Sequence, residues 1–137
     1  MDIRAATRAD VTALVALWER CGLLRPWNDP RADIERALGF AGSTVLVGMA
    51  GDALAASVMV GEDGHRGWIY YLAVEPEERN AGHGRAMLLA AEGWLRERGV
   101  PKLNLMVRTE NEAVEAFYAS LGYERSQVIV LAKPLAR

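Results

Sequence analysis

The sequence has very few of the side chains that build disulfides and metal centres. Its single cysteine, Cys21, excludes a disulfide within the chain. Its two histidines, His65 and His83, are too few for a spaced cysteine and histidine set that holds a metal. We therefore expect neither a disulfide framework nor a metal site.

Long apolar runs and an excess of positive charge are also missing. No apolar run is long enough to cross a bilayer, and the first ten residues, MDIRAATRAD, carry charges where a secretory signal needs an apolar core. The formal net charge of −2 argues against general nucleic-acid binding, which requires a basic surface. These features favour a cytoplasmic protein that binds neither membranes nor nucleic acid.

The composition that remains is ordinary for one globular domain. Of the 137 residues, 51% are hydrophobic and 25% are charged, which is enough to bury a core. No linker, internal repeat or low-complexity segment divides the chain. We predict a single domain spanning residues 1–137.

Hydrophobic periodicity and turn residues predict the element order β-α-α-β-β-β-α-β-α-β. The helices are expected after Thr7, after an Asp29 cap followed by Pro30, from Ala86 to Arg98, and after an Asn111 cap. The strands are expected at 2–6, in the two runs of STVLVGMAGDALAASVMVG that meet at Gly51-Asp52, at 68–74, at 102–107 and at 127–132 (QVIVLA).

The connections between these elements indicate the fold class. Three strands joined by short turns should be antiparallel neighbours, whereas the strand-helix-strand passage from Trp68 to Val107 should be a right-handed parallel crossover. We therefore expect an α+β fold with a single mixed, mainly antiparallel sheet and helices on both faces. A doubly wound Rossmann sheet is not expected.

A glycine-rich segment, RNAGHGRAM at residues 79–87, lies between a predicted strand and a predicted helix. It places backbone N–H groups at the positive end of a helix dipole, where an anion is stabilised. The chain has no Gly-Lys-Ser/Thr, so this is not a nucleoside-triphosphate loop. A Rossmann fingerprint needs a third Gly or Ala where Met87 stands. Neither nucleotide-binding pattern fits.

A third pattern does fit. Arg79-x-x-Gly82-x-Gly84, after a strand ending LAVEP, resembles the R/Q-x-x-G-x-G/A signature of the GCN5-related N-acetyltransferases, the GNAT superfamily. The segment NEAVEAFYASLGYE is similar to the family's N-x-x-A-x-x-x-Y-x-x-x-G-F/Y block, and the predicted element order is that of the GNAT fold. The segments LLRPWNDP and DGHRG further resemble small bacterial members of the YpeA type.

The resemblance implies an acetyl-CoA-dependent N-acetyltransferase. Such an acyltransferase moves the acetyl group directly to a primary amine of a small-molecule or peptide acceptor, and the resemblance also allows a homodimer. The alternative function is an acyl-CoA-binding regulatory module with little catalytic activity.

By the same resemblance, the cofactor residues lie in the glycine loop and in the strand before it. The loop is expected to hold the pyrophosphate of coenzyme A through Arg79, Asn80, Ala81, Gly82, His83, Gly84 and Arg85. In the family the preceding strand splays from its neighbour at a bulge. The backbone groups of Leu72 and Val74 are expected to pair with the pantetheine arm there, and one N–H to polarise the thioester carbonyl. Asn111 either only caps its helix or also contacts the cofactor.

The resemblance assigns a catalytic acid but no base. Tyr118 falls on the family's tyrosine, which protonates the departing thiolate; the alternative is a buried packing tyrosine. Met106 stands where relatives often carry Glu in a strand block L-E-V-R. Glu75, Glu110, or a water held by Tyr70 or Tyr71 remain alternatives for the base.

The acceptor wall is expected in the loop between the first two helices, as is common in the family. Trp27, Asn28 and Asp29 lie there, and Tyr70 is assigned to the same wall. A tryptophan next to an aspartate can hold a cationic amine by cation–π and ionic contacts. Alternatively, the loop buries Trp27 and Asp29 only caps the second helix.

Overall fold

The computed structural model describes residues 1–135 of the chain. These residues form two compact units, Met1–Leu105 and a second unit that begins at Met106. One domain spanning residues 1–137 stays a prediction. Within the described range, no helix has both the length and the apolar character that crossing a membrane requires.

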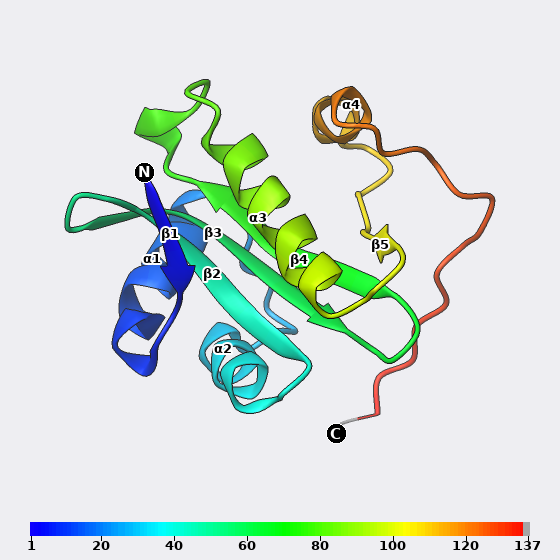
Figure 1. Ribbon diagram of the computed structural model, residues 1–137, viewed down its shortest axis with the longest axis horizontal. Helices are drawn as coiled ribbons and strands as arrows, with labels where there is room; N and C mark the ends of the chain where they lie inside the picture. The colour runs from blue at the N-terminus through cyan, green and yellow to red at the C-terminus, as the bar shows by residue number, and fades with distance from the viewer. Residues whose placement is uncertain (136–137) are drawn as a thin grey trace. The chain divides into compact units, whose positions relative to one another are not determined.

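The first unit is built on a mixed sheet with the strand order β1-β2-β3-β4-β5 (Figure 1). Pairing is antiparallel from β1 to β4 and parallel between β4 and β5, which confirms the predicted α+β class. The strands are β1 Asp2–Ala5, β2 Ser43–Ala50, β3 Ala53–Glu62, β4 Gly67–Val74 and β5 Leu103–Asn104.

Helices α2 and α4 begin where the sequence supplies a capping side chain. The carboxylate of Asp29 accepts from the Ala32 N–H at 3.1 Å, directly before Pro30. Asn111 likewise accepts from the Val114 N–H at 3.2 Å in the second unit. The α-helices are α1 Val11–Arg20, α2 Pro30–Gly39, α3 His83–Glu97 and α4 Glu112–Ser120, with 3-10 turns at Arg8–Asp10 and Pro76–Glu78.

Alternation along β2 directs its side chains to two separate helical layers. Val45 and Val47 are fully buried in the apolar cluster that contains Trp18 of α1. Gly48 faces the other way, and a Cβ built on it lies 3.1 Å from the Met87 sulfur of α3. Figure 1 accordingly shows α1 and α2 on one face of the sheet and α3 across the other, as predicted.

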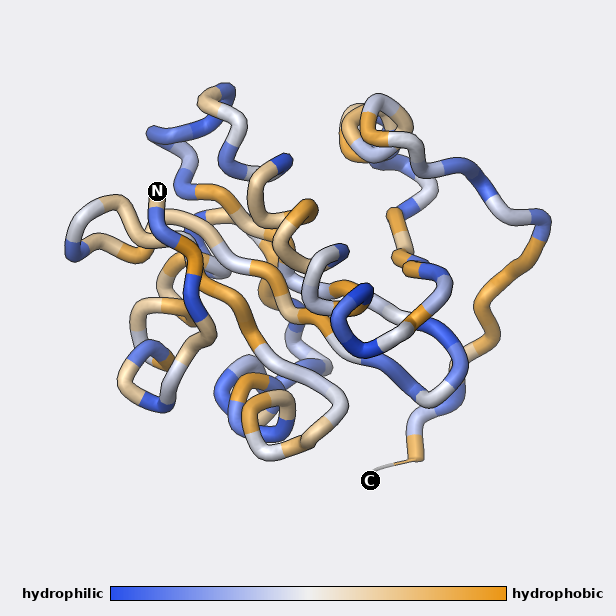
Figure 2. Tube along the Cα trace, in the orientation of Figure 1, coloured by the Kyte–Doolittle hydropathy of each residue, from blue (hydrophilic) through white to orange (hydrophobic). Residues whose placement is uncertain are grey.

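Two predicted strands differ from the observed ones. The strand expected at 102–107 is reduced to the two residues of β5. The strand expected at 127–132 is wrong: those residues form no strand, although Figure 2 colours the segment as hydrophobic. The side chains from Val128 to Leu131 are between 62% and 85% exposed. Apolar β-branched residues favour strands, but a strand also needs a partner with which to exchange hydrogen bonds.

Candidate cofactor and acceptor site

A β-bulge interrupts β4 at Tyr71 and Leu72. Ser57 pairs with Ala73 and Met59 pairs with Tyr70, so one residue of β3 lies opposite two residues of β4. Tyr71 adopts a left-handed backbone, φ +53°, which is rare for a bulky side chain. The strand before the glycine loop therefore has the bulge that the sequence analysis expected.

Beyond the bulge, one edge of β4 is open. Within residues 1–135, β5 pairs only with Gly67 and Trp68 of β4. The Glu75 N–H donates to the Ala55 carbonyl on the β3 side at 2.7 Å. Because successive residues of a strand direct their N–H groups to alternate edges, Leu72 and Val74 direct theirs to the open edge. These are the two residues assigned to the pantetheine arm.

One backbone group at this edge already has a partner. The carbonyl oxygen of Val74 lies 3.3 Å from the Cys21 sulfur, which is placed to donate its thiol hydrogen. Cys21 is half-buried against the apolar cluster of α1 and α2. The thiol therefore fixes the end of β4 rather than filling the core alone.

A buried network that the sequence analysis missed holds the bulge in place. The Trp18 indole N–H donates to the Ser57 hydroxyl at 2.8 Å, and that hydroxyl donates to the Tyr71 carbonyl at 2.9 Å. The Trp18 and Tyr71 rings stack with centroids 3.7 Å apart and planes 5° from parallel. The available signal was a lone serine within the apolar run ALAASVMV, and Ser57 is indeed fully buried.

The Tyr71 side chain links the bulge to α2. Its hydroxyl donates to the Asp33 carboxylate at 2.8 Å. Burial raises the pKa of Tyr71 above its ordinary value, and the bond to Asp33 raises it further. Tyr71 therefore stays protonated, and its hydroxyl hydrogen is committed to Asp33.

The glycine loop exposes backbone N–H groups at the start of α3. Asn80 and Gly82 are left-handed, with φ +68° and +81°. The first hydrogen bond of the helix runs from the Ala86 N–H to the Gly82 carbonyl at 3.0 Å, so the N–H groups before Ala86 precede the helical ladder. The exposed members of the assigned set are Arg79, Asn80, Ala81, Gly82 and Arg85, while His83 and Gly84 are half-buried.

Charged partners constrain two side chains beside the loop. His83 lies 3.4 Å from the Glu78 carboxylate through its Nε2. Both oxygens of Glu75 accept hydrogen bonds from the Arg20 guanidinium, the shortest at 2.6 Å. Both oxygens of Glu75 are therefore already engaged by Arg20, which disfavours Glu75 as the base.

The expected acceptor wall is only partly as the sequence analysis described it. Trp27 is 71% exposed, so the alternative in which the loop buries it is wrong. Asn28 is exposed, and the Asp29 carboxylate is engaged in capping α2. Tyr70 is 46% exposed and lies opposite Met59, which packs against the cluster under α1 and α2. The bulge thus places Tyr70 and Tyr71 on the same face of the sheet.

The second unit contains the remaining predicted site residues. Tyr118 is 8% exposed, and its ring makes edge contacts with Phe117 at 5.3 Å and Tyr123 at 5.7 Å. Burial raises the pKa of Tyr118 to about 12. Met106 is 50% exposed, and Glu110 accepts from the Thr109 hydroxyl at 3.2 Å.

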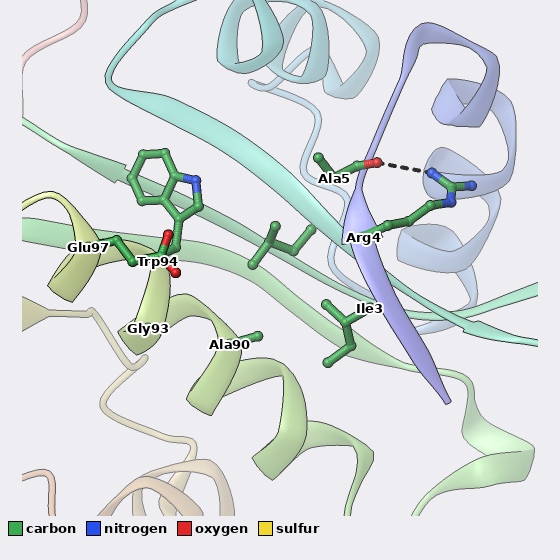
Figure 3. A pocket seen from close by; sticks show the side chains of 8 residues that line it. Ile3, Arg4, Ala5, Ala90, Gly93, Trp94 and Glu97 are labelled. Carbon is green, nitrogen blue, oxygen red and sulfur yellow. Dashed lines mark hydrogen bonds between the residues drawn. The ribbon is translucent and has the colours of Figure 1, made fainter.

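A hollow of about 420 Å³ is lined by β1, by Leu46 and by the C-terminal half of α3, including Trp94 (Figure 3). It contains no residue of the bulge or of the glycine loop. Across residues 1–135, no cluster of His, Cys, Asp and Glu has the makings of a metal site.

Comparison with known proteins identifies the family. Residues 11–123 match the model of the acetyltransferase (GNAT) family. The chain is 47% identical over 135 residues to an acetyltransferase of Yersinia enterocolitica, covering 98% of this chain and 96% of the relative. An acetyltransferase of Pectobacterium atrosepticum gives the same identity and coverage.

Solved structures agree on the fold. A putative acetyltransferase from Agrobacterium tumefaciens has a TM-score of 0.83 at 20% identity, with 98% of this chain and 100% of that chain covered. AAC(6')-Iy, solved with the bisubstrate analogue CoA-S-monomethyl-acetylneamine, has a TM-score of 0.83 at 17% identity, with 98% of each chain covered. This chain belongs to the acetyltransferase (GNAT) family.

Proposed function

We propose that this acyltransferase moves the acetyl group of acetyl-CoA directly to a primary amine of a small-molecule or peptide acceptor. The observation that carries the proposal is the open edge of β4 at the bulge, followed directly by exposed N–H groups at the start of α3. An extended pantetheine arm can pair with such an edge as an added strand does. A pyrophosphate is stabilised at a helix N-terminus of this kind.

In the proposed reaction the neutral amine nitrogen attacks the thioester carbonyl and forms a carbon–nitrogen bond. The carbon–sulfur bond then breaks, and the nitrogen releases one proton to water. The N–H of Leu72 or Val74 stabilises the negative charge that develops on the carbonyl oxygen. The amides from Asn80 to Arg85 hold the pyrophosphate, with positive charge from Arg79 and Arg85. Tyr118 gives its proton to the departing thiolate. With a pKa of about 12 it remains protonated at neutral pH, as this role requires.

A second candidate function is an acyl-CoA-binding module with little chemistry. Two observations favour it: Met106 cannot accept a proton, and Glu75 is held by Arg20. Such a module would keep the open edge and the loop but would release no thiol in the presence of amines.

One pair of measurements tests both functions. CoA and acetyl-CoA should raise the melting temperature, whereas NAD and ATP should raise it much less. Thiol release from acetyl-CoA with a panel of primary amines should then separate the enzyme from the module. Equal stabilisation by ATP would refute the cofactor assignment. CoA binding without thiol release would favour the module.

A further inference from the structure

The Asp33 carboxylate is half-buried and lacks a cationic partner. Asp10 is paired with Arg4 at 2.8 Å, and Glu75 is paired with Arg20 at 2.6 Å. Within residues 1–135, no arginine, lysine or histidine nitrogen lies within 4.0 Å of Asp33. Its side chain is held by the Tyr71 hydroxyl, a neutral donor, and it lies in the first turn of α2, where the helix dipole also favours a negative charge.

The bulge in β4 brings the Tyr71 hydroxyl to the Asp33 carboxylate of α2. Tyr71, whose hydroxyl holds the Asp33 carboxylate at 2.8 Å, is itself the left-handed residue of the bulge. Leu72, the next residue, is the proposed donor to the thioester carbonyl. Asp33 therefore lies one tyrosine side chain away from the backbone where the acetyl group is proposed to react.

The sheet face under α1 and α2 also carries Tyr70, one of the expected acceptor residues. Tyr71 stacks on Trp18 of α1, and Tyr70 lies on the same face with nearly half of its surface exposed. The sequence pattern had suggested Asp29 as the negative group of the acceptor wall. The structure uses Asp29 to cap α2 and presents Asp33 one helical turn later.

We propose that Asp33 binds a positively charged ammonium group of the acceptor other than the nitrogen that attacks the thioester, with Tyr71 as the positioning residue that holds the carboxylate. The inference rests on the proposed function and specifies its substrate class as a primary amine that carries a second positive charge. An incoming cation stabilises the negative charge of a partly desolvated carboxylate that has only a neutral donor on one oxygen. The acceptor's positive charge supplies the cationic partner that no side chain within residues 1–135 provides.

The test uses two probes that differ only in charge. Choline and its neutral isostere 3,3-dimethyl-1-butanol are compared as inhibitors of thiol release from acetyl-CoA with a primary amine that the wild type acetylates. We expect choline to inhibit the wild type at a concentration at least about ten-fold lower than the neutral alcohol requires, because a charge-assisted contact favours the cation. Asp33→Asn should reduce this preference to about two-fold and raise KM for the amine by about ten- to a hundred-fold. KM for acetyl-CoA should change by less than about three-fold.

Matched variants separate recognition from folding. Asn keeps the shape of Asp33 and a carbonyl that still accepts the Tyr71 hydroxyl. Glu35→Gln, at an exposed position two residues further along α2, removes the same charge and should retain the choline preference. Tyr71→Phe keeps the ring on Trp18 and frees the carboxylate, so we expect it to lower the choline preference about three-fold. Should Asp33→Asn fail to fold, an unchanged choline preference in Tyr71→Phe would contradict the proposal.

The outcomes are distinguishable. A wild type that binds CoA but releases no thiol with any amine overturns the proposed function and this inference with it. A wild type that acetylates amines while folded Asp33→Asn keeps its amine KM and its choline preference overturns Asp33 alone. Equal inhibition of the wild type by choline and by the neutral alcohol also overturns it.

Discussion

The surroundings of Tyr71 and Tyr118 show two different uses of a tyrosine whose pKa is raised by burial. In the first unit, the Tyr71 ring is stacked on Trp18 and its hydroxyl is bound to Asp33. In the second unit, the Tyr118 ring is packed between two aromatic rings, and no residue in the described range bonds to its hydroxyl.

The difference predicts a positioning role for Tyr71 and a reactive role for Tyr118. Within residues 1–135, no fully buried polar side-chain atom lacks a partner, so the Tyr118 hydroxyl must reach the surface. A hydroxyl that is already committed, as in Tyr71, orders the backbone around it. A protonated hydroxyl that reaches the surface can donate to a ligand. The predictions below test this contrast.

The largest effect is expected from Tyr118→Phe, which removes only the hydroxyl. Charge develops on sulfur as the thioester bond breaks, so loss of the acid should lower turnover by about ten- to a thousand-fold while acetyl-CoA affinity changes little. Turnover is measured by thiol release, with Tyr123→Phe as a ring-preserving control from the same aromatic cluster. Unchanged turnover in a step limited by chemistry would remove Tyr118 from the mechanism.

The next largest effect concerns the network that fixes Tyr71. Ser57→Ala removes the acceptor of the Trp18 N–H and the donor to the Tyr71 carbonyl, both in a buried place. We expect unfolding free energy to fall by about 2–4 kcal/mol, since each group left unpaired costs about 1–3 kcal/mol. Ser43→Ala, which loses one bond to the Ala37 carbonyl, should cost only about 1 kcal/mol. Equal losses in urea unfolding would show that the network does not stabilise the bulge.

A smaller effect is expected at the glycine loop. A Cβ at Gly82 meets nothing within 4 Å, so a Gly82→Val side chain points into the space proposed for the pyrophosphate. CoA affinity, measured by calorimetry, should weaken by about ten- to a hundred-fold. Gly51→Val, at the β2–β3 turn, imposes a similar positive-φ strain, φ +62°, and should leave CoA affinity unchanged. The loop assignment is refuted if both variants bind CoA as the wild type does.

The contrast also shows which parts of the molecule could be predicted from sequence. The β2–β3 turn at Gly51-Asp52 and the caps at Asp29 and Asn111 depend on residues within four positions of each other, and local patterns identify them. The bond from Tyr71 to Asp33 joins residues 38 positions apart, and that from Trp18 to Ser57 joins residues 39 apart. No local pattern specifies such pairs, because they form only when the sheet and helices pack together.

The final predicted strand failed for the same reason. QVIVLA has strong local strand propensity, yet propensity does not supply a pairing partner. The glycine loop, in contrast, was predicted correctly as a strand-to-helix turn, because its turn residues and its helix start lie within a few residues of each other. The predicted helix start at Ala86 was wrong by three residues, since α3 begins at His83.

The smallest effect is expected at an ion pair remote from both tyrosines. The Arg4 guanidinium donates to both oxygens of Asp10 at 2.8 and 2.9 Å, and these bonds, with one from the Thr7 N–H, lower the pKa of Asp10 to about 2. A carboxyl whose pKa is lower in the folded state than in the unfolded state stabilises the fold above the unfolded value of 3.8. That contribution is lost as the pH falls from about 4 to about 2.

Because Arg4 is half-exposed and screened by solvent, we expect a loss on the order of 1–2 kcal/mol. Between pH 5 and pH 2.5, the free energy of unfolding measured in urea should fall by this amount more in the wild type than in Asp10→Asn. The stabilities of the two proteins should therefore converge at the lower pH. CoA affinity at pH 7 should be the same for both, because the pair lies where β1 leads into α1 and contacts neither the bulge nor the glycine loop. Parallel pH profiles of stability for the two proteins would show that Asp10 is not the group that titrates. Weakened CoA binding by Asp10→Asn would show that this ion pair is coupled to the site after all.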